Sequence, residues 1–128
     1  MVVYVTHCSA KKRKSGRPMS PIELYTSKRA QAFMRRCVEM RVRWAIFSDQ
    51  YGVWFPDTKR RWYELSPDAV TDDMFIHLVR DFDIKLRRYT KIFFYYHPAR
   101  FHRLYRRLVR TTIHAKKIVL IRHVALIG

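Results

Sequence analysis

Apolar residues in this chain occur in two patterns: short continuous runs, and longer stretches in which they recur every three or four positions. The continuous runs predict four β-strands, at residues 2–6, 44–47, 92–96 and 118–121. Because consecutive positions are apolar in these runs, both faces of each strand should be covered. The pattern therefore indicates a parallel sheet that lies between two layers of helices.

Three helical stretches separate the predicted strands. Residues 20–23 read Ser-Pro-Ile-Glu, an N-cap, a proline at the first helical position and a capping-box Glu, and residues 26–27 give a second start signal. The second helical region should open at residues 66–68 and the third at Pro98. In each stretch, apolar residues three and four positions apart predict one buried face. These faces are Ala30, Phe33, Met34 and Cys37, then Phe75, Val79, Phe82, Leu86 and Tyr89, then Phe101, Leu104, Tyr105 and Leu108.

The alternation of strands and helices predicts one α/β domain over residues 1–128, with a four-stranded, mostly parallel sheet and helices on both faces. Right-handed crossovers favour the strand order 2-1-3-4. Residues 53–66, with Pro56, are expected to form an irregular loop. The tail at residues 124–127 is too apolar to end in water, so it should extend the sheet or contact a second copy or larger complex.

Composition narrows the class of protein. A chain of 128 residues with 48% hydrophobic and 15% aromatic residues has enough apolar side chains for one core, which argues against disorder. No apolar run approaches the roughly 20 residues that span a bilayer, so no membrane span is expected. The first residues lack the basic region of a signal peptide and read as a strand, so the expected location is the cytoplasm.

The charge is strongly one-sided. Lys and Arg total 27 against 10 acidic residues, a net charge of +17, which predicts attraction to a polyanion. The lack of Asn, with only two Gln, fits a thermophilic source, but a thermophile surface would gain charges of both signs. Nucleic acid is therefore the favoured partner; an anionic membrane surface, another acidic partner and a merely solvated surface are the alternatives.

Polar residues follow each predicted strand, and ligands of parallel α/β sheets bind beyond the carboxyl ends of the strands. The alternative is that strand ends are polar because they meet water. The candidate catalytic residues here are Cys8, Ser48, Asp49 and His97, and His7, Ser9 and His123 are candidate pocket residues.

Several chemistries are open at this edge. Cys8 could be a thiolate activated by His97 or His123, or it could simply pack or contact a ligand. Asp49 could act as a base or bind a hydroxyl, or it could cap a helix or pair with an Arg. Six His and two Cys without the spacing of metal ligands predict no metal site, and no other cofactor is expected.

Basic residues gather in two places outside these strand ends, although a run of like charges is often only a solvated face. Four aromatic residues, Trp54, Phe55, Trp62 and Tyr63, could stack on unpaired bases, with core packing as the alternative for two of them. The candidate phosphate contacts are Lys11, Lys12, Arg13, Lys14 and Arg17 in a flexible loop, Arg60 and Arg61 beside the aromatics, and Arg103, Arg106, Arg107 and Arg110 on one side of the third helix.

Three motifs in order resemble an uncharacterised prokaryotic and phage domain family: C-x-x-x-K at residues 8–12, L-Y-T-S at 24–27 and S-x-x-Y-G at 48–52. The third motif is also similar to the S-x-x-Y-G element of the peroxide-stress YaaA family, and Cys8-Ser9 with the lysines that follow resembles the archaeosine synthase core domain. In this chain Asp49 and Gln50 replace the family's Ala and Lys, and His97-Pro98 stands where the family has a glycine turn. The resemblance implies a Rossmann-like domain whose pocket includes Cys8, Lys12, Tyr25, Ser27, Ser48, Tyr51 and Gly52.

Together these features predict a nucleic-acid-binding domain, for RNA more than for DNA, that uses the basic helix and the basic loop. One alternative is an enzyme that processes a nucleotide or nucleobase at the strand-end pocket. Another is a structural subunit of a ribonucleoprotein, held through the apolar tail. We also expect Gly52 to have a positive φ, where the chain leaves the second strand.

Overall fold

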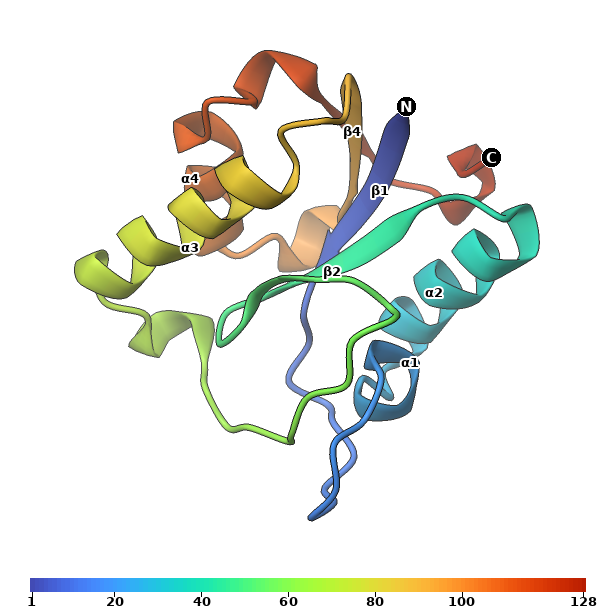
Figure 1. Ribbon diagram of the computed structural model, residues 1–128, viewed down its shortest axis with the longest axis vertical. Coiled ribbons are helices and arrows are strands. Elements are labelled where there is room, and N and C mark those ends of the chain that lie inside the picture. The colour runs from blue at the N-terminus through green and yellow to red at the C-terminus, as the bar shows by residue number, and fades with distance from the viewer.

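A five-stranded sheet runs through the middle of the computed structural model, which describes residues 1–128 (Figure 1). The strand order is β3-β2-β1-β4-β5, and β3 alone is antiparallel to its neighbour. The carboxyl ends of the four parallel strands therefore lie at one edge. The strands are β1 (Val2–His7), β2 (Trp44–Ser48), β3 (Gly52–Trp54), β4 (Lys91–Tyr95) and β5 (Ile118–Ile121).

The predicted α/β class with a mostly parallel sheet is confirmed, but the predicted count of four strands is wrong. The four expected strands keep their expected neighbours, and β3 adds a fifth at the edge beside β2. A tight turn makes this possible: the Ser48 hydroxyl accepts hydrogen bonds from the amides of Gln50 and Tyr51, and Gly52 has φ 73° as expected. Three residues carry too little alternation to be recognised as a strand, which is why 53–66 was expected to be a loop.

Helices cover both faces of the sheet (Figure 1). α1 (Pro21–Leu24) and α2 (Lys28–Met40) lie on one face, and α3 (Asp72–Lys85) and α4 (Arg103–Thr111) lie on the other. The predicted capping box is confirmed, since the Ser20 hydroxyl accepts from the Glu23 amide and Glu23 accepts from the Ser20 amide. None of the helices has the length and apolar character to cross a bilayer.

The last two helices begin later than predicted. Residues 67–69 form a separate 3-10 turn, and α3 starts only after Thr71, whose hydroxyl caps it. Pro98 likewise opens a 3-10 turn, and α4 starts after His102. The prediction failed there because the His102 imidazole caps the Leu104 amide, a role that Ser, Thr, Asp or Asn more often fills.

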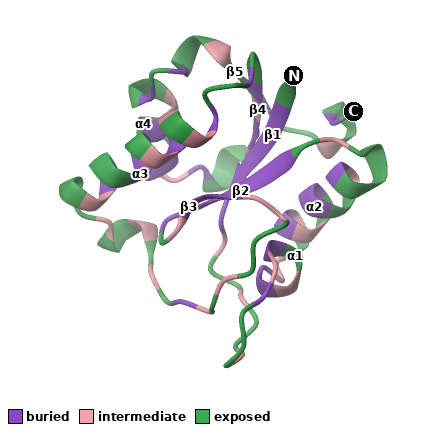
Figure 2. Ribbon diagram, viewed as in Figure 1, coloured by how far each residue is buried: buried purple, intermediate pink, exposed green.

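Every side chain on the three predicted helical faces is buried (Figure 2). Leu86 and Tyr89 follow the end of α3 and Phe101 precedes α4, so the faces are confirmed as buried sets but extend beyond the helices. The five residues of β2 are all buried as well, so that strand is covered on both faces. β5 differs, because it is an edge strand on which Val119 and Leu120 are 38% and 44% exposed. The expectation that every strand is covered on both faces is therefore wrong for β5.

The apolar tail folds back instead of extending the sheet. Val124–Leu126 form a 3-10 turn beside α2, and Ile127 is 1% exposed. The Arg36 guanidinium of α2 donates from Nε to the Ile127 carbonyl at 3.2 Å. The added strand, one of the two predicted alternatives, is not formed, because Ile127 is buried by this chain itself. Leu126 is 57% exposed, and contact with a second copy or larger complex stays a prediction.

Candidate functional site at the carboxyl edge of the sheet

The carboxyl edge of the sheet gathers only some of the predicted site residues. His7 and Cys8 after β1, and Ser48 and Asp49 after β2, are all buried at this edge. The other two candidate histidines, His97 and His123, are exposed and contact neither Cys8 nor Asp49. His97 accepts a hydrogen bond from the Ala99 amide as a cap, and the His123 side chain makes no hydrogen bond. The proposed pairing of Cys8 with either histidine is therefore wrong.

Cys8 is instead a buried, protonated thiol. Its Sγ lies 3.3 Å from the Tyr105 hydroxyl of α4, and its own backbone amide donates to Phe47. Burial raises the pKa of the Cys8 thiol to about 11, and the neighbouring Asp49 carboxylate raises that pKa further. A nucleophilic cysteine needs its thiolate at working pH, so Cys8 packs or contacts a ligand rather than attacking one.

Asp49 is the acidic group of the edge. It is 2% exposed, and its Oδ1 has no hydrogen-bond partner. Burial raises the pKa of this carboxyl, while hydrogen bonding to Cys8 and the charge of Lys12 oppose the shift. Its side chain lines a cavity of about 120 Å³ together with Cys8, Ser9, Lys12, Leu65 and Tyr105, which we call the Asp49 cavity.

A hydroxyl network borders this cavity. The Tyr25 and Tyr63 hydroxyls lie 2.6 Å apart, and the Ser48 hydroxyl donates to Tyr63 at 3.1 Å. The Lys12 ammonium lies 4.5 Å from the centre of the Tyr63 ring. Burial raises the pKa of both tyrosines, so both hydroxyls stay protonated. Ser48 thus holds the β2–β3 turn and the network rather than acting as a nucleophile.

Of the motif residues, Cys8 and Lys12 line the Asp49 cavity, and Tyr25 and Ser48 belong to the hydroxyl network beside it. Tyr51 and Gly52 lie at the β2–β3 turn and line a separate hollow of about 320 Å³ that also touches Asp49. Ser27 caps α2 through the Ala30 amide. Tyr63 was expected among base-stacking aromatics and not in the pocket, because nothing in its sequence neighbourhood indicates that its loop crosses the strand ends.

A second pocket, of about 530 Å³, opens beside the first between the end of β1 and the start of α2, and we call it the Arg29 pocket. No carboxylate lines it. His7, Ser9 and Ser27 contribute polar side chains to its wall. The cations that line it are Lys11, Lys28, Arg29 and Arg100.

Arg29 is fixed in place by the end of β1. Its Nη1 donates to the Thr6 hydroxyl at 2.7 Å and its Nη2 to the His7 carbonyl at 2.8 Å. Burial and the adjacent Arg29 charge lower the pKa of His7 to about 3, so this imidazole is neutral. Arg29 and Arg100 were not among the predicted site residues. The position of Arg29 in the first turn of α2, the main helix after β1, was a signal that could have identified it.

The basic loop at residues 11–17 projects beyond the sheet at the bottom of Figure 1. It was expected to be flexible, yet its backbone is tied to α1: the Thr26 amide donates to the Lys11 carbonyl and the Arg13 amide to Leu24. Arg17 forms an ion pair with Glu23 at 2.9 Å. The start of the loop is therefore held against the end of α1, and Lys11, Lys12, Arg13 and Lys14 have no carboxylate partner.

The predicted aromatic platforms are largely covered. Trp54 and Tyr63 are buried, which is the core packing allowed for two of the four. Phe55 lies 4.1 Å from the Arg43 guanidinium, and Trp62 lies 4.9 Å from the Lys14 ammonium. Close by, Arg60 lies over the Tyr51 ring and Arg61 is exposed. Of the aromatics, only the half-buried Phe55 and Trp62 retain surface for stacking.

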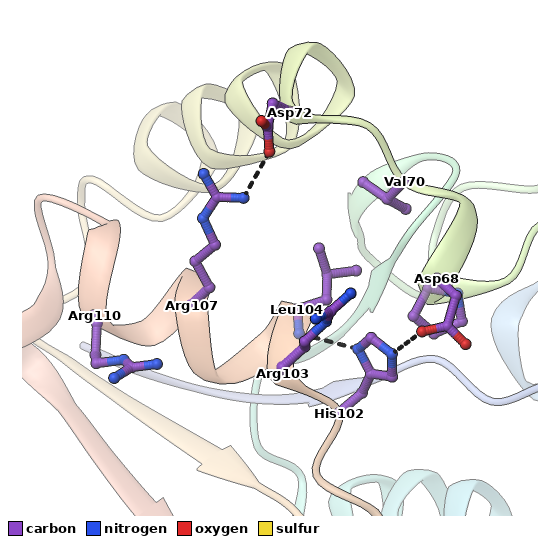
Figure 3. A pocket seen from close by; sticks show the side chains of 9 residues that line it. Asp68, Val70, Asp72, His102, Arg103, Leu104, Arg107 and Arg110 are labelled. Carbon is purple, nitrogen blue, oxygen red and sulfur yellow. Dashed lines mark hydrogen bonds and ion pairs between the residues drawn. The ribbon is translucent and has the colours of Figure 1, made fainter.

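All four predicted arginines of α4 are exposed, as expected. They are not equally free. Arg107 forms an ion pair with Asp72 of α3 at 3.0 Å and lies 4.1 Å from the Phe75 ring, whereas no carboxylate contacts Arg103 or Arg110. Figure 3 shows Asp72, Arg103, Arg107 and Arg110, which line a cleft of about 450 Å³. The spacing along α4 could not indicate the ion pair of Arg107, because Asp72 approaches from another helix.

No group of three or more His, Cys, Asp or Glu side chains lies close enough together to hold a metal ion. The polar residues of the edge instead offer hydrogen bonds and positive charge. No protein-family model, no curated protein sequence and no solved structure matches this chain. The resemblance carried by the three motifs therefore stays a prediction, and function is inferred from the site alone.

Proposed function

We propose that this chain is a nucleic-acid-binding domain whose ligand is single-stranded RNA. One observation carries the proposal: only four of its 27 Lys and Arg side chains lie within 4.0 Å of a carboxylate. Like charges repel, and a bound polyanion removes that repulsion. The unpaired cations include those of the Arg29 pocket, most of those in the basic loop and three arginines of α4, Arg103, Arg106 and Arg110.

The surroundings of α4 favour a single strand over a duplex. A helix that reads duplex DNA inserts its amino end into the major groove. Here that end is flanked by residues 67–72: His102 bonds to Asp68 at 2.7 Å, and Arg107 pairs with Asp72 (Figure 3). An unpaired strand can follow the exposed arginines and place a base in a cavity, which is how most sequence-specific RNA recognition works.

The test is fluorescence anisotropy with labelled RNA and DNA of one sequence, each single-stranded and duplex, over about 50 to 200 mM salt. We expect single-stranded RNA to bind most tightly and its affinity to fall as salt rises. Arg103→Gln with Arg110→Gln should weaken binding several-fold more than Arg87→Gln with Arg88→Gln. The second pair makes the same charge change beyond α3, at the opposite edge of the sheet. Equal losses, or no binding at about 50 mM salt, would contradict the proposal.

A second function, an enzyme that processes a nucleotide or nucleobase, is favoured by Asp49 alone. A buried carboxyl with a raised pKa and an unpartnered oxygen in a cavity is the arrangement of many general acids and bases. Its test is mass spectrometry of RNA and mononucleotides after incubation with the protein. A product that disappears with Asp49→Asn would support the enzyme, and unchanged substrates would leave a binding domain.

A further inference from the structure

We infer that the Arg29 pocket and the Asp49 cavity together form one binding site for a single nucleotide whose base carries an exocyclic amino group. The inference rests on the proposed function and names the part of the ligand that this edge would recognise. The phosphate occupies the Arg29 pocket, and the base occupies the Asp49 cavity.

Unpartnered polar atoms concentrate at these two cavities. Four buried side-chain atoms in the molecule lack a hydrogen-bond partner, and three of them, His7 Nε2, Ser9 Oγ and Asp49 Oδ1, belong to residues that line one or both cavities. Native proteins satisfy nearly all buried polar groups, so such a cluster indicates that a ligand supplies the missing partners. His7 and Asp49 are 5% and 2% exposed, which makes both too buried for bulk water to satisfy them freely.

The two cavities share a wall. Cys8, Ser9 and Ala10 line both of them, so a ligand that passes over Ser9 reaches from one cavity into the other. The two hollows differ in chemistry on either side of that wall: one is cationic, and the other combines an acid with apolar side chains. A nucleotide has this same division between an anionic phosphate and a planar base.

The Arg29 pocket fits a phosphate. Lys11, Lys28 and Arg100 surround Arg29 without any carboxylate to neutralise them. Arg29 is held by β1 through both Nη atoms, while its Nε–H makes no hydrogen bond within the protein. A guanidinium fixed in this way loses little conformational freedom when it binds phosphate.

His7 adds an acceptor to the same pocket. Its Nδ1 lies 2.9 Å from the Cys8 carbonyl, which can only accept, and 3.5 Å from Arg29 Nη2, which can only donate. The shorter contact favours the proton on Nδ1, which leaves Nε2 as an acceptor without a partner. A phosphodiester offers no donor to such an atom, whereas the sugar of a ribonucleotide has hydroxyls that can donate. The pocket can therefore contact the sugar of a nucleotide as well as its phosphate.

The Asp49 cavity fits a base. Its volume of about 120 Å³ leaves room for a small planar ring. Leu65 and Tyr105 provide apolar wall, and Ser9 and Lys12 flank the acid. Carboxyl oxygens accept from the amino group of cytosine, whereas uracil has a carbonyl at that position. We therefore expect cytidine monophosphate to bind more tightly than uridine monophosphate.

Calorimetry with four probes tests the site: cytidine monophosphate, uridine monophosphate, cytidine and inorganic phosphate. We expect the cytidine nucleotide to bind about tenfold more tightly than the uridine nucleotide, the ratio that one good base contact supplies. The cytidine nucleotide should also bind at least tenfold more tightly than cytidine alone or phosphate alone. Arg29→Gln should remove the advantage over cytidine, and Asp49→Asn the advantage over uridine monophosphate. Arg88→Gln should change neither ratio.

Lys11→Gln is the second variant on the phosphate side, because Lys11 is exposed and its loss should not disturb folding. Inorganic phosphate that binds as tightly as either nucleotide would overturn the nucleotide site. Equal affinity for the two nucleotides, unaffected by Asp49→Asn, would overturn the base cavity and with it the inference. RNA binding without mononucleotide binding would overturn this inference and leave the proposed function, whereas absence of both would contradict both.

Discussion

The slope of log affinity against log salt concentration measures how many phosphates the protein neutralises. Replacing Arg107 with Ala should make this slope less negative by about 0.7 on single-stranded RNA. Each phosphate neutralised by an Arg releases condensed counterions. The free energy gained from this release falls as the salt concentration rises, so the affinity falls too. The four exposed arginines of α4 together should contribute about −2.8 to the slope on a single strand and about −3.6 on a duplex. Between ~50 and ~200 mM salt, the α4 contacts alone then lower affinity roughly 50-fold on a single strand and 150-fold on a duplex.

The ion pair of Arg107 adds a contrast that the other arginines do not have. Arg107 must leave Asp72, 3.0 Å away, before it can bind a phosphate fully. An exposed pair of this kind stabilises by about 0 to 1 kcal/mol, so Asp72→Asn should raise RNA affinity by up to about fivefold. The matched control is Asp73→Asn, which makes the same charge change in the same first turn of α3 but breaks no ion pair.

Anisotropy titrations of the two variants and of Arg107→Ala at several salt concentrations measure these effects. Equal gains from Asp72→Asn and Asp73→Asn would mean that only long-range charge matters and that Arg107 touches no phosphate. A slope unchanged by Arg107→Ala would place the contacts elsewhere, first on the loop at residues 11–17. Stability should fall by no more than about 2 kcal/mol, because Arg107 is itself exposed, and its ion pair with Asp72 and its contact with the Phe75 ring contribute at most about 1 kcal/mol each.

Three further predictions concern the edge of the sheet. Gly52→Ala should lower the free energy of unfolding in urea by about 2 kcal/mol or more, because φ is 73° and a Cβ would lie 2.2 Å from the Asp81 carboxylate; a loss under about 0.5 kcal/mol would refute this. Iodoacetamide at pH 8 should label Cys8 far more slowly in the folded protein than in urea, since its pKa is about 11, and equal rates would contradict the buried thiol. The stability due to neutral His7 should be fully present above pH 6.5 and decline as pH falls toward 3, by about 1.4 kcal/mol per pH unit, because the unfolded chain takes up the proton first; His7→Gln should remove that slope.

The strand ends illustrate how far a pattern along the chain can reach. Periodicity placed Cys8, Ser48 and Asp49 at one edge, and the structure brings them together there. It could not tell which groups would face them. Tyr63 and Tyr105 reach Ser48 and Cys8 from 15 and 97 positions away, and neither separation follows from a helix or strand repeat.

For the basic residues, the sequence indicates the kind of partner, but only the fold decides which side chains are free to bind it. Composition alone indicated a polyanionic partner, because the net charge of +17 does not depend on folding. Which cations are free depends on folding entirely: Arg107 meets Asp72 across 35 positions, while Arg29 folds against the end of β1 and leaves a pocket without acid. An ion pair needs its two side chains within a few ångströms, and that proximity is set by how α3 packs beside α4.

The sequence by itself thus determined the class of fold, the four parallel strands, the buried faces of the helices and the positive φ of Gly52, because each follows from local periodicity or backbone sterics. Tertiary structure decided the rest. It added β3, folded the apolar tail onto α2, withdrew the exposed His97 from Cys8 and left Asp49 Oδ1 unpartnered. These outcomes depend on contacts between distant segments. Many arrangements of such contacts have comparable energies, and one arrangement is selected only when the whole core packs together.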